Sequence, residues 1–314
     1  MSASLRKGEA APDEAGRGTA AGGEAAGRAA RAAAPGASPP GDARRAPGAS
    51  PPAEPAPLTA PRASRLRRAA PPLAVVAVLL AAWELVVRAG LVDELLLPAP
   101  TQVLEALWVD RDLLAPDLLV TAYEVVAGLA ASLVVGVGLA VAMHLVPAID
   151  RSLRPLVVGS QAVPIPVIAP IVVLILGFGL APKILIITLI CFFPVTVNVS
   201  DGLRASDPDA GKLLRSLGAT PWQRLRLLDA PSALPAAFTG MKVAAAVAVI
   251  GAVLAEWSGS SAGLGHLLIT ANGQLETARA FAATVLLMAM AIALYALFAV
   301  LERKVVSWAP RARS

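Results

Sequence analysis

The chain has 314 residues, of which 56% are hydrophobic and only 16% are charged. This balance excludes an ordinary soluble domain and indicates a protein that lies in a lipid bilayer. The formal net charge of +5 comes from residues 1–68, which hold eleven Lys or Arg and six acidic residues. It therefore indicates a basic tail near anionic headgroups and argues against a nucleic-acid-binding surface.

Residues 1–70 consist mostly of Ala, Gly, Pro, Ser and Arg, with almost no large apolar side chains. Such a segment cannot bury enough surface to offset its chain entropy, so we expect a disordered cytoplasmic tail. Its end, RASRLRRAAPPLAVVAVLLAAW, has the basic stretch and apolar core of a signal peptide. More than sixty residues precede this stretch and the apolar run continues to Val87, so we expect a retained signal-anchor.

The rest of the chain, residues 71–308, is predicted to be an all-α, polytopic membrane domain. A spanning helix needs about 20 mostly apolar residues. Six segments qualify: 72–90, 119–146, 155–178, 183–201, 234–257 and 280–302. Only Gly179-Leu180-Ala181-Pro182 separates the third segment from the fourth, which predicts a tight hairpin. A five-span count stays open if 72–90 lies on the membrane surface, although its apolar density argues against that.

Loop charges predict the orientation, because basic loops face the cytoplasm. The loop 91–118 holds six acidic residues against Arg111 alone, and the loop 258–278 has neither Lys nor Arg. The turn 147–154, the loop 202–233 and the C-terminal tail are basic. This alternation places both termini and the loop 202–233 in the cytoplasm.

The long cytoplasmic loop is predicted to hold two short helices. Asp207 is a suitable N-cap, Pro208 takes the first helical position, and Asp209 lies near the positive end of the helix dipole. Gly218 ends this helix, and Thr220 caps the next one.

The side chains of these helices permit two interpretations. Leu213, Leu214 and Leu217 share one face of the first helix, and Trp222 lies in the first turn of the second. The segment either rests on lipid headgroups as an amphipathic helix or fits a groove in a soluble partner protein. Composition alone does not decide between them.

A resemblance decides between these interpretations. The loop and the following DAPSALPAAFTGMKVAAAVAVIGAVLAEW resemble the corresponding region of ABC importer permeases, in the binding-protein-dependent transport inner-membrane family. The similarity covers residues 72–308 and is strongest to the sulfonate/taurine/nitrate group. Four further stretches carry it: LLLPAPTQVLEAL (95–107), PIPVIAPIVVLILGFG (164–179), FFPVTVNVSDGLRASDP (192–208) and SSAGLGHLL (260–268). KLLRSLGA, GAVLAEW and TARAFAA are similar to members assigned to thiamine-precursor pyrimidines or riboflavin.

In that family the loop carries the EAA motif, which couples the permease to its ATPase. The family's Glu-Ala-Ala is here Lys212-Leu213-Leu214, so a base replaces the acid, and Asp209 is a partial substitute. The resemblance implies that the coupling residues are Asp209, Lys212, Leu213, Leu214, Arg215, Leu217, Gly218 and Trp222.

Candidate pathway residues lie in the third, fourth and fifth spans. Gln161, Pro164 and Pro166 belong to a proline-rich stretch whose irregular backbone suits a water-filled pathway or a kinked packing helix. Asn198 either lines the pathway or hydrogen-bonds to a neighbouring helix. Glu256 and Trp257 end the fifth span, where a Trp suits the interfacial belt and a carboxylate is a candidate for gating or solute contact.

The function that follows from the resemblance is a permease subunit in the inner or plasma membrane. It would act as a homodimer with two ABC ATPase subunits and an extracytoplasmic solute-binding protein. Thiamine-precursor pyrimidines or riboflavin are the favoured solutes, with sulfonate, taurine or nitrate next.

Other classes are less well supported by the sequence. We expect no enzyme activity, cofactor or metal site, since GxxxxGK[ST], HExxH and Cys/His clusters are missing from the sequence and Cys191 is its only cysteine. An ion-coupled secondary transporter is the alternative. It would need charges at the midplane of several spans and internal repeats, whereas Glu84, Glu124 and Glu256 fall near predicted span ends. A simple membrane anchor would not need the proline-rich third span.

Overall fold

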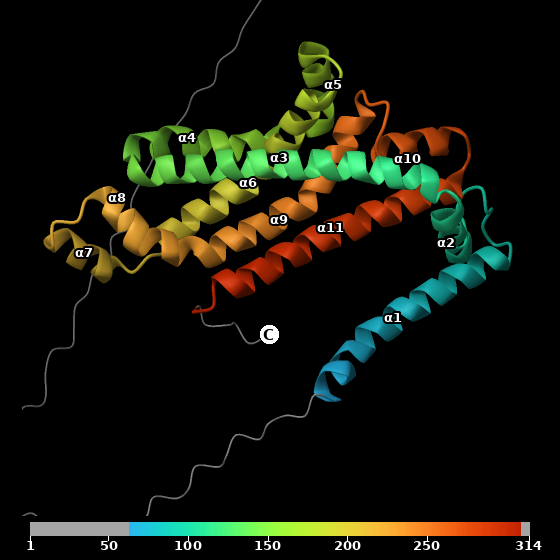
Figure 1. The fold of residues 1–314 in the computed structure, drawn as a ribbon, viewed down its shortest axis with the longest axis horizontal. Coiled ribbons are helices and arrows are strands. Elements are labelled where there is room, and N and C mark those ends of the chain that lie inside the picture. Colours follow the sequence, from blue (N-terminus) through green and yellow to red (C-terminus); the bar gives the residue numbers. More distant parts are fainter. Residues whose placement is uncertain (1–62, 309–314) are drawn as a thin grey trace, which may run out of the picture. The chain divides into compact units, whose positions relative to one another are not determined.

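The computed structural model describes residues 63–308, which form helices joined by turns and loops and include no strand (Figure 1). The all-α class is therefore confirmed for this part of the chain. Helix α1 spans Ala63–Arg88 and begins before the boundary expected at residue 70. The disorder expected for the tail falls mainly on residues 1–62, which lie outside the described residues.

Four long helical segments are apolar enough to cross a membrane: α3 (Arg111–Leu145), α6 (Leu180–Arg204), the rod Pro221–Trp257, and α11 (Thr277–Val305). The rod consists of α8 (Pro221–Arg224), the π-helical turn η2 (Leu225–Asp229) and α9 (Ala230–Trp257). A bent pair of helices gives a fifth crossing if it counts as one span. Helix α1, in the place of the expected first span, is not among these five.

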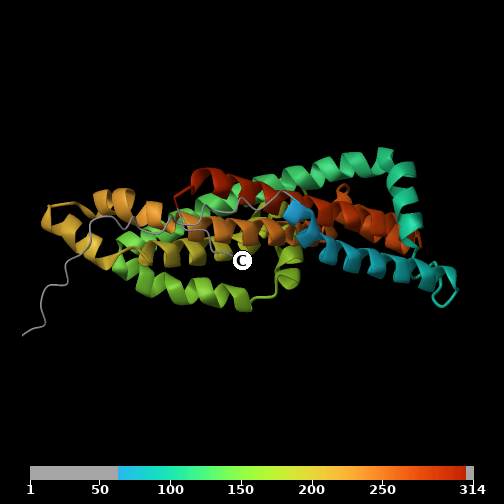
Figure 2. The ribbon, with the colours of Figure 1, turned by 90° about the horizontal axis from the view of Figure 1, so that it is seen from below.

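Helices α3, α6 and α9 form the core and run side by side in both views (Figures 1 and 2). Small residues allow this close packing, as is usual between helices in membranes. A Cβ atom added at Gly240 of α9 would lie 2.8 Å from the carbonyl oxygen of Pro194 on α6. The interface between these helices buries Cys191, Val195 and Ala244 completely.

The third expected span is not one straight helix. It consists of α4 (Pro147–Gly159), the 3-10 turn η1 (Ser160–Ala162) and α5 (Ile165–Leu176), with a bend of 100°. The break lies at Val163, whose ψ of 119° is the extended conformation that a following proline, Pro164, imposes. The proline-rich sequence therefore breaks the span where it was expected to bend or break it.

The hairpin after α5 lies slightly earlier than expected. Gly177 and Gly179 have φ values of +78° and +137°, so they and Phe178 form the turn. Leu180, Ala181 and Pro182 already belong to the first turn of α6.

The two ends of the bundle differ. One end, which we call the α7 end, carries α7 (Pro208–Ser216), α8 and η2. The other, the α10 end, carries α2 (Pro100–Val109) and α10 (Leu264–Gly273). Helix α1 reaches the α10 end, where Glu84 accepts hydrogen bonds from Arg88 at 2.6 Å and from the Thr101 hydroxyl at 2.8 Å.

Candidate functional site

The polar segment at the α7 end folds as the local sequence signals predict. The Asp207 side chain accepts a hydrogen bond from the Asp209 backbone N–H at 2.9 Å and so caps α7. Gly218, at φ +79°, ends the turn after α7. Thr220 and Gln223 form a reciprocal capping box at the start of α8.

This segment presents a compact set of exposed apolar side chains. Leu213, Leu217 and Trp222 are 60%, 74% and 60% exposed, and Leu214 is half-buried. We call Leu213, Leu217 and Trp222 the docking surface. Large apolar groups on a polar segment outside the apolar spans indicate a protein or membrane contact.

Charges surround the docking surface. Lys212, which stands where the family motif has an acid, pairs with Asp209 at 2.8 Å, and both side chains are exposed. Arg215 is also exposed. The local pair with Asp209 balances the Lys212 charge, so the replaced acid leaves no isolated cation at that position.

A buried carboxylate fastens the docking segment to the bundle. Asp229 in η2 is 1% exposed. It lies 2.9 Å from His144 Nε2 at the end of α3 and accepts a 2.6 Å hydrogen bond from the Ser206 hydroxyl before α7. Arg224 Nε lies 3.2 Å from the same carboxylate, although it is not aligned for a hydrogen bond. We call His144, Ser206, Arg224 and Asp229 the Asp229 cluster.

The cluster also reaches α7. The Arg224 guanidinium passes over Gly211, where an added Cβ would lie 3.4 Å from its central carbon. The π-helical turn, a feature frequent at functional sites, places Asp229 at this junction. Sequence reasoning did not single out Asp229. The available signal was a single acid directly before the apolar run of α9.

Replacing Asp229 with Asn should destabilise the protein by about 3 kcal/mol, because removing one charge from a buried pair leaves its partners uncompensated. Asp201→Asn is the matched control at the same end. The Asp201 side chain is 64% exposed and 3.9 Å from Arg154, so this change should stay within about 0.5 kcal/mol. Unfolding of the purified variants in detergent measures both values, and equal effects would contradict the role given to the Asp229 cluster.

At the α10 end a second buried carboxylate, Glu256, is 1% exposed. One oxygen accepts a 2.6 Å hydrogen bond from the Thr121 hydroxyl, and the other accepts from the backbone N–H groups of Gly265 and His266 at 2.5 and 3.2 Å. Gly265 and His266 belong to the first turn of α10, where a negative charge is favourable. The Trp257 ring donates a 3.0 Å bond to the Gly265 carbonyl.

Glu256 thus attaches α10 to α9 and α3. The close approach requires Gly263, since a Cβ there would lie 2.2 Å from a carboxylate oxygen of Glu256 and the residue has φ +111°. The sequence identified Glu256 and Trp257 as a pair at the end of the fifth span. It did not show that the Thr121 hydroxyl and the backbone N–H groups of Gly265 and His266 satisfy the carboxylate.

The other candidate pathway residues lie apart from this pair. Gln161, Pro164 and Pro166 are exposed at the bend between α4 and α5. Asn198 is partly buried at the α6–α9 interface, and its amide donates to the Pro194 carbonyl of its own helix at 2.7 Å. The expected hydrogen bond to a neighbouring helix is therefore replaced by one within α6, where a proline sits in the helix.

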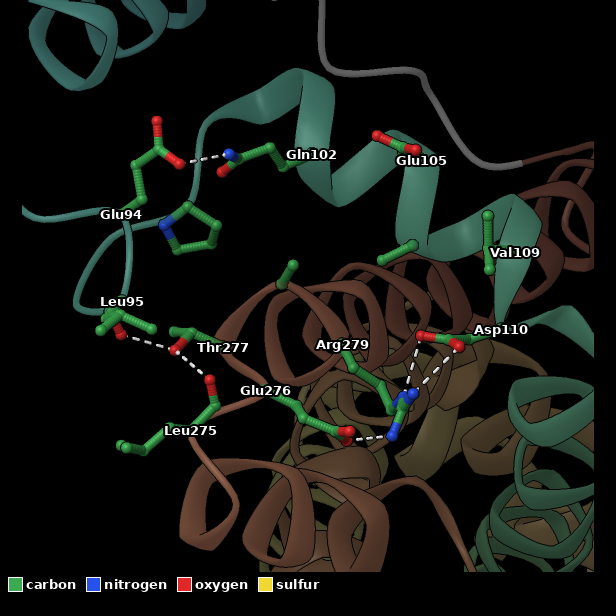
Figure 3. A pocket seen from close by; sticks show the side chains of 13 residues that line it. Glu94, Leu95, Gln102, Glu105, Val109, Asp110, Leu275, Glu276, Thr277 and Arg279 are labelled. Atoms are coloured by element: carbon green, nitrogen blue, oxygen red, sulfur yellow. Dashed lines mark hydrogen bonds and ion pairs between the residues drawn. The ribbon is translucent and has the colours of Figure 1, made fainter.

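A groove of about 450 Å³ opens at the α10 end between α2 and the start of α11 (Figure 3). Arg279 spans it and pairs with Asp110 at 2.8 Å and with Glu276. Glu94, which accepts a 2.8 Å bond from Gln102, and Glu105 also line the groove. Acidic groups therefore outnumber basic ones on this surface.

The apolar helices and the polar segment between two of them define a multi-pass, all-helical membrane protein. Residues 132–307 match the family described as "Binding-protein-dependent transport system inner membrane component". The chain belongs to this family, and the resemblance found in the sequence is confirmed.

Three relatives each match at least half of the chain. It is 38% identical to a probable ABC transporter permease protein of Haemophilus influenzae, over 71% of this chain and 91% of the relative. It is 34% identical to the formylaminopyrimidine transport permease protein ThiX of Halalkalibacterium halodurans, over 73% of this chain and 92% of the relative. The riboflavin transport system permease protein RibX of Chloroflexus aurantiacus is 36% identical, over 51% of this chain and 60% of the relative.

A solved structure supports the fold. The chain is similar to one described as "Crystal structure of an amino acid ABC transporter with histidines", with a TM-score of 0.51 and 16% identity. The match covers 63% of this chain and 96% of that one. The family and these relatives identify a transmembrane ABC transporter permease.

Proposed function

We propose that this chain is the membrane-spanning subunit of an ATP-driven importer and forms the solute pathway as a homodimer with six spans per copy. Each copy would dock on one of two ATPase subunits and receive solute from an extracytoplasmic binding protein. The docking surface is the observation that carries this proposal, because exposed Leu213, Leu217 and Trp222 on short helices suit a groove in a water-soluble partner.

Two buried carboxylates, Asp229 and Glu256, connect the docking surface to the α10 end of the bundle through α9. The Asp229 cluster attaches the docking segment to α3 and to the start of α9, and Glu256 at the end of α9 holds α10. Helix α9 has 28 residues and a length of about 42 Å. Movement of the ATPase groove would push the docking surface and be passed along α9 to α10. The differential contact of the surface with two ATPase states would supply the free energy.

This mechanism requires the α7 end to face the cytoplasm, together with both termini. Ser216 at the α7 end and Ser261 at the α10 end are both exposed, and the only native cysteine, Cys191, is buried. A membrane-impermeant maleimide should label Ser261→Cys in intact cells but label Ser216→Cys only after permeabilisation. Labelling of Ser216→Cys in intact cells would reverse the orientation and contradict the mechanism.

The acidic groove at the α10 end is proposed to face the binding protein. Glu256 would act in gating through α10, since one of its carboxylate oxygens accepts hydrogen bonds from the backbone N–H groups at the start of that helix. Gln161, Pro164, Pro166 and Asn198 remain proposed pathway residues. Strongly exposed apolar side chains of α5 and the following turn, Leu174 at 85% and Phe178 at 84%, would meet lipid or the second copy.

The solute is proposed from the relatives, two of which are named for formylaminopyrimidine and riboflavin transport. These two classes come first, and sulfonate, taurine and nitrate come next. The test is uptake into proteoliposomes that contain the permease, its ATPase and its binding protein. We expect uptake of formylaminopyrimidine or riboflavin that requires ATP, whereas uptake driven by an ion gradient without ATP would favour the secondary-transporter alternative.

A further inference from the structure

A cavity of about 350 Å³ lies at the α7 end, where α7, α8 and η2 meet the end of α3. Its ionisable lining consists of His144, Arg215, Arg224 and Asp229. We call it the Arg215 cavity. Three of these four side chains belong to the Asp229 cluster, whereas Arg215 comes from the last turn of α7 and has had no partner described so far.

The arginines of the Arg215 cavity lack acceptors. The Arg215 side chain makes no hydrogen bond and no ion pair with the rest of residues 63–308. Arg224 pairs with Asp229 through Nε, and its two terminal nitrogens make no hydrogen bond within the same residues. The Arg224 side chain is 29% exposed, so these nitrogens remain accessible. A guanidinium has five N–H donors, and the cavity therefore holds more donors than acceptors.

The acid in this lining is already occupied. Among the described residues that line the cavity, Asp229 alone is acidic, and its two oxygens contact His144 and the Ser206 hydroxyl. Asp209 on α7 pairs with Lys212 and does not line the cavity. Two guanidinium groups against one carboxylate leave a net positive charge, which attracts an anion. The planar fork of a guanidinium fits a carboxylate or a phosphate.

The packing of α7 on α8 directs Arg215 toward the cavity. Gly211 lies one helical turn before Arg215 and therefore on the same face of α7. This face contacts Arg224, since a Cβ added at Gly211 would lie 3.4 Å from the central carbon of its guanidinium. Arg215 itself is exposed, so a group from outside the bundle can reach it.

The docking surface lies at the edge of the cavity. Leu217 follows Arg215 by two residues, and Trp222 directly follows Pro221, which lines the cavity. Leu217 and Trp222 are both exposed. A protein that covers these two side chains therefore also covers the residues beside them in the cavity wall. This position favours an anionic side chain of that protein over a free phosphate or a lipid headgroup.

We propose that the Arg215 cavity receives an Asp or Glu side chain of the ATPase subunit. The carboxylate accepts hydrogen bonds from Arg215 and from the terminal nitrogens of Arg224, beside the apolar contact of the docking surface. Lys212 stands where the family motif has an acid, so the permease supplies the cation of this contact and the ATPase supplies the anion. The inference rests on the proposed transport function and names the chemistry of the partner surface.

Binding of the ATPase subunit to the full-length chain in lipid nanodiscs tests the site. Arg215→Gln changes an exposed side chain, so this variant should fold. It should weaken ATPase binding about tenfold or more, because a hydrogen bond between two charged groups is a strong one. Wild-type binding should also weaken as the salt concentration rises, and the variant should lose part of this dependence.

Arg151→Gln is the matched control. Arg151 is exposed on α4 at the same end of the bundle and does not line the Arg215 cavity. Because an exposed charge outside the contact contributes little, ATPase binding by this variant should stay within about twofold of wild type.

A zero-length cross-linker identifies the group that enters the cavity. Arg215→Lys places a primary amine there, and a carbodiimide joins an amine to a carboxylate that contacts it. Mass spectrometry should show an amide bond between position 215 and an Asp or Glu of the ATPase, and peptide mapping separates it from any product of Lys212. Arg215→Glu combined with Arg at the identified ATPase position should restore the binding that each single change weakens.

Three results would overturn the site: unchanged ATPase binding by Arg215→Gln, an equal loss in Arg151→Gln, or no cross-link from position 215 to an ATPase acid. Loss of a co-purified anionic lipid from Arg215→Gln, with ATPase binding retained, would also overturn it and assign the cavity to a lipid headgroup. If Leu217→Arg still abolished ATPase binding in these cases, the site alone would be wrong and the proposed transport function would stand.

Discussion

Replacing Leu217 with Arg is expected to abolish ATP-driven uptake and stable association with the ATPase, while the permease still folds. Leu217 is 74% exposed, so its replacement should change the free energy of unfolding by no more than about 0.5 kcal/mol. A charged side chain in an apolar groove would instead remove a central contact, and such contacts contribute about 2 kcal/mol or more. That loss weakens association about 30-fold or more. Co-purification with the tagged ATPase measures the effect directly.

Leu91→Arg provides the matched control. Leu91 is also 74% exposed but follows α1 at the opposite end of the bundle. The same substitution there should leave co-purification with the ATPase unchanged. If the Leu217 variant retained the ATPase at wild-type levels, or if both variants lost it equally, the docking surface would be wrongly placed.

Replacing Gly263 with Ala is expected to be the most destabilising single-methyl change at the α10 end. The new Cβ would lie 2.2 Å from the Glu256 carboxylate, and the residue has φ +111°. Accommodating it requires loss of the hydrogen bonds between Glu256 and α10. We expect the free energy of unfolding to fall by about 4 kcal/mol, as is typical when a buried hydrogen-bond network is broken. Unfolding in detergent and the yield of folded protein measure it.

The Gly177→Ala variant is the control that measures the cost of backbone strain alone, without a contact to Glu256. Gly177 also has a positive φ, +78°, but no atom lies within 4 Å of its added Cβ, so only about 1–2 kcal/mol of strain is expected. A double variant, Gly263→Ala with Glu256→Ala, should be no less stable than Gly263→Ala alone, because the two changes remove the same interaction. If the two substitutions lowered the free energy of unfolding additively, Gly263 would not be needed for the hydrogen bonds between Glu256 and α10.

The sequence predicted those features that depend on neighbouring residues. The caps at Asp207 and Thr220 and the stop at Gly218 rest on contacts within three residues, and the helices α7 and α8 follow them. Four of the six expected spans coincide with helices apolar enough to cross a membrane, and a fifth does if the bent pair counts as one span. The break at Pro164 follows from the geometry of proline. The size of the bend, 100°, does not follow from the sequence.

The buried polar pairs could not be predicted in the same way. His144 and Asp229 are 85 residues apart and Lys183 and Glu124 are 59 apart, so only the packing of α3 against α6 and η2 brings them together. The sequence placed Glu124 near the start of a span at 119–146, whereas α3 begins at Arg111 and Glu124 lies well inside it. The contact of α10 with this part of α3, through the Leu264 N–H and the Thr121 hydroxyl, could not be predicted from the sequence either.

The central claim is that the docking surface seats in an ATPase subunit, and site-specific cross-linking tests it most directly. Since Cys191 is buried, a thiol introduced by Leu213→Cys or Leu91→Cys is the accessible one for a heterobifunctional photo-cross-linker in membranes that contain the assembled transporter. A covalent product with the ATPase is predicted from position 213 and not from position 91. A product from position 91 with none from position 213 would contradict the account.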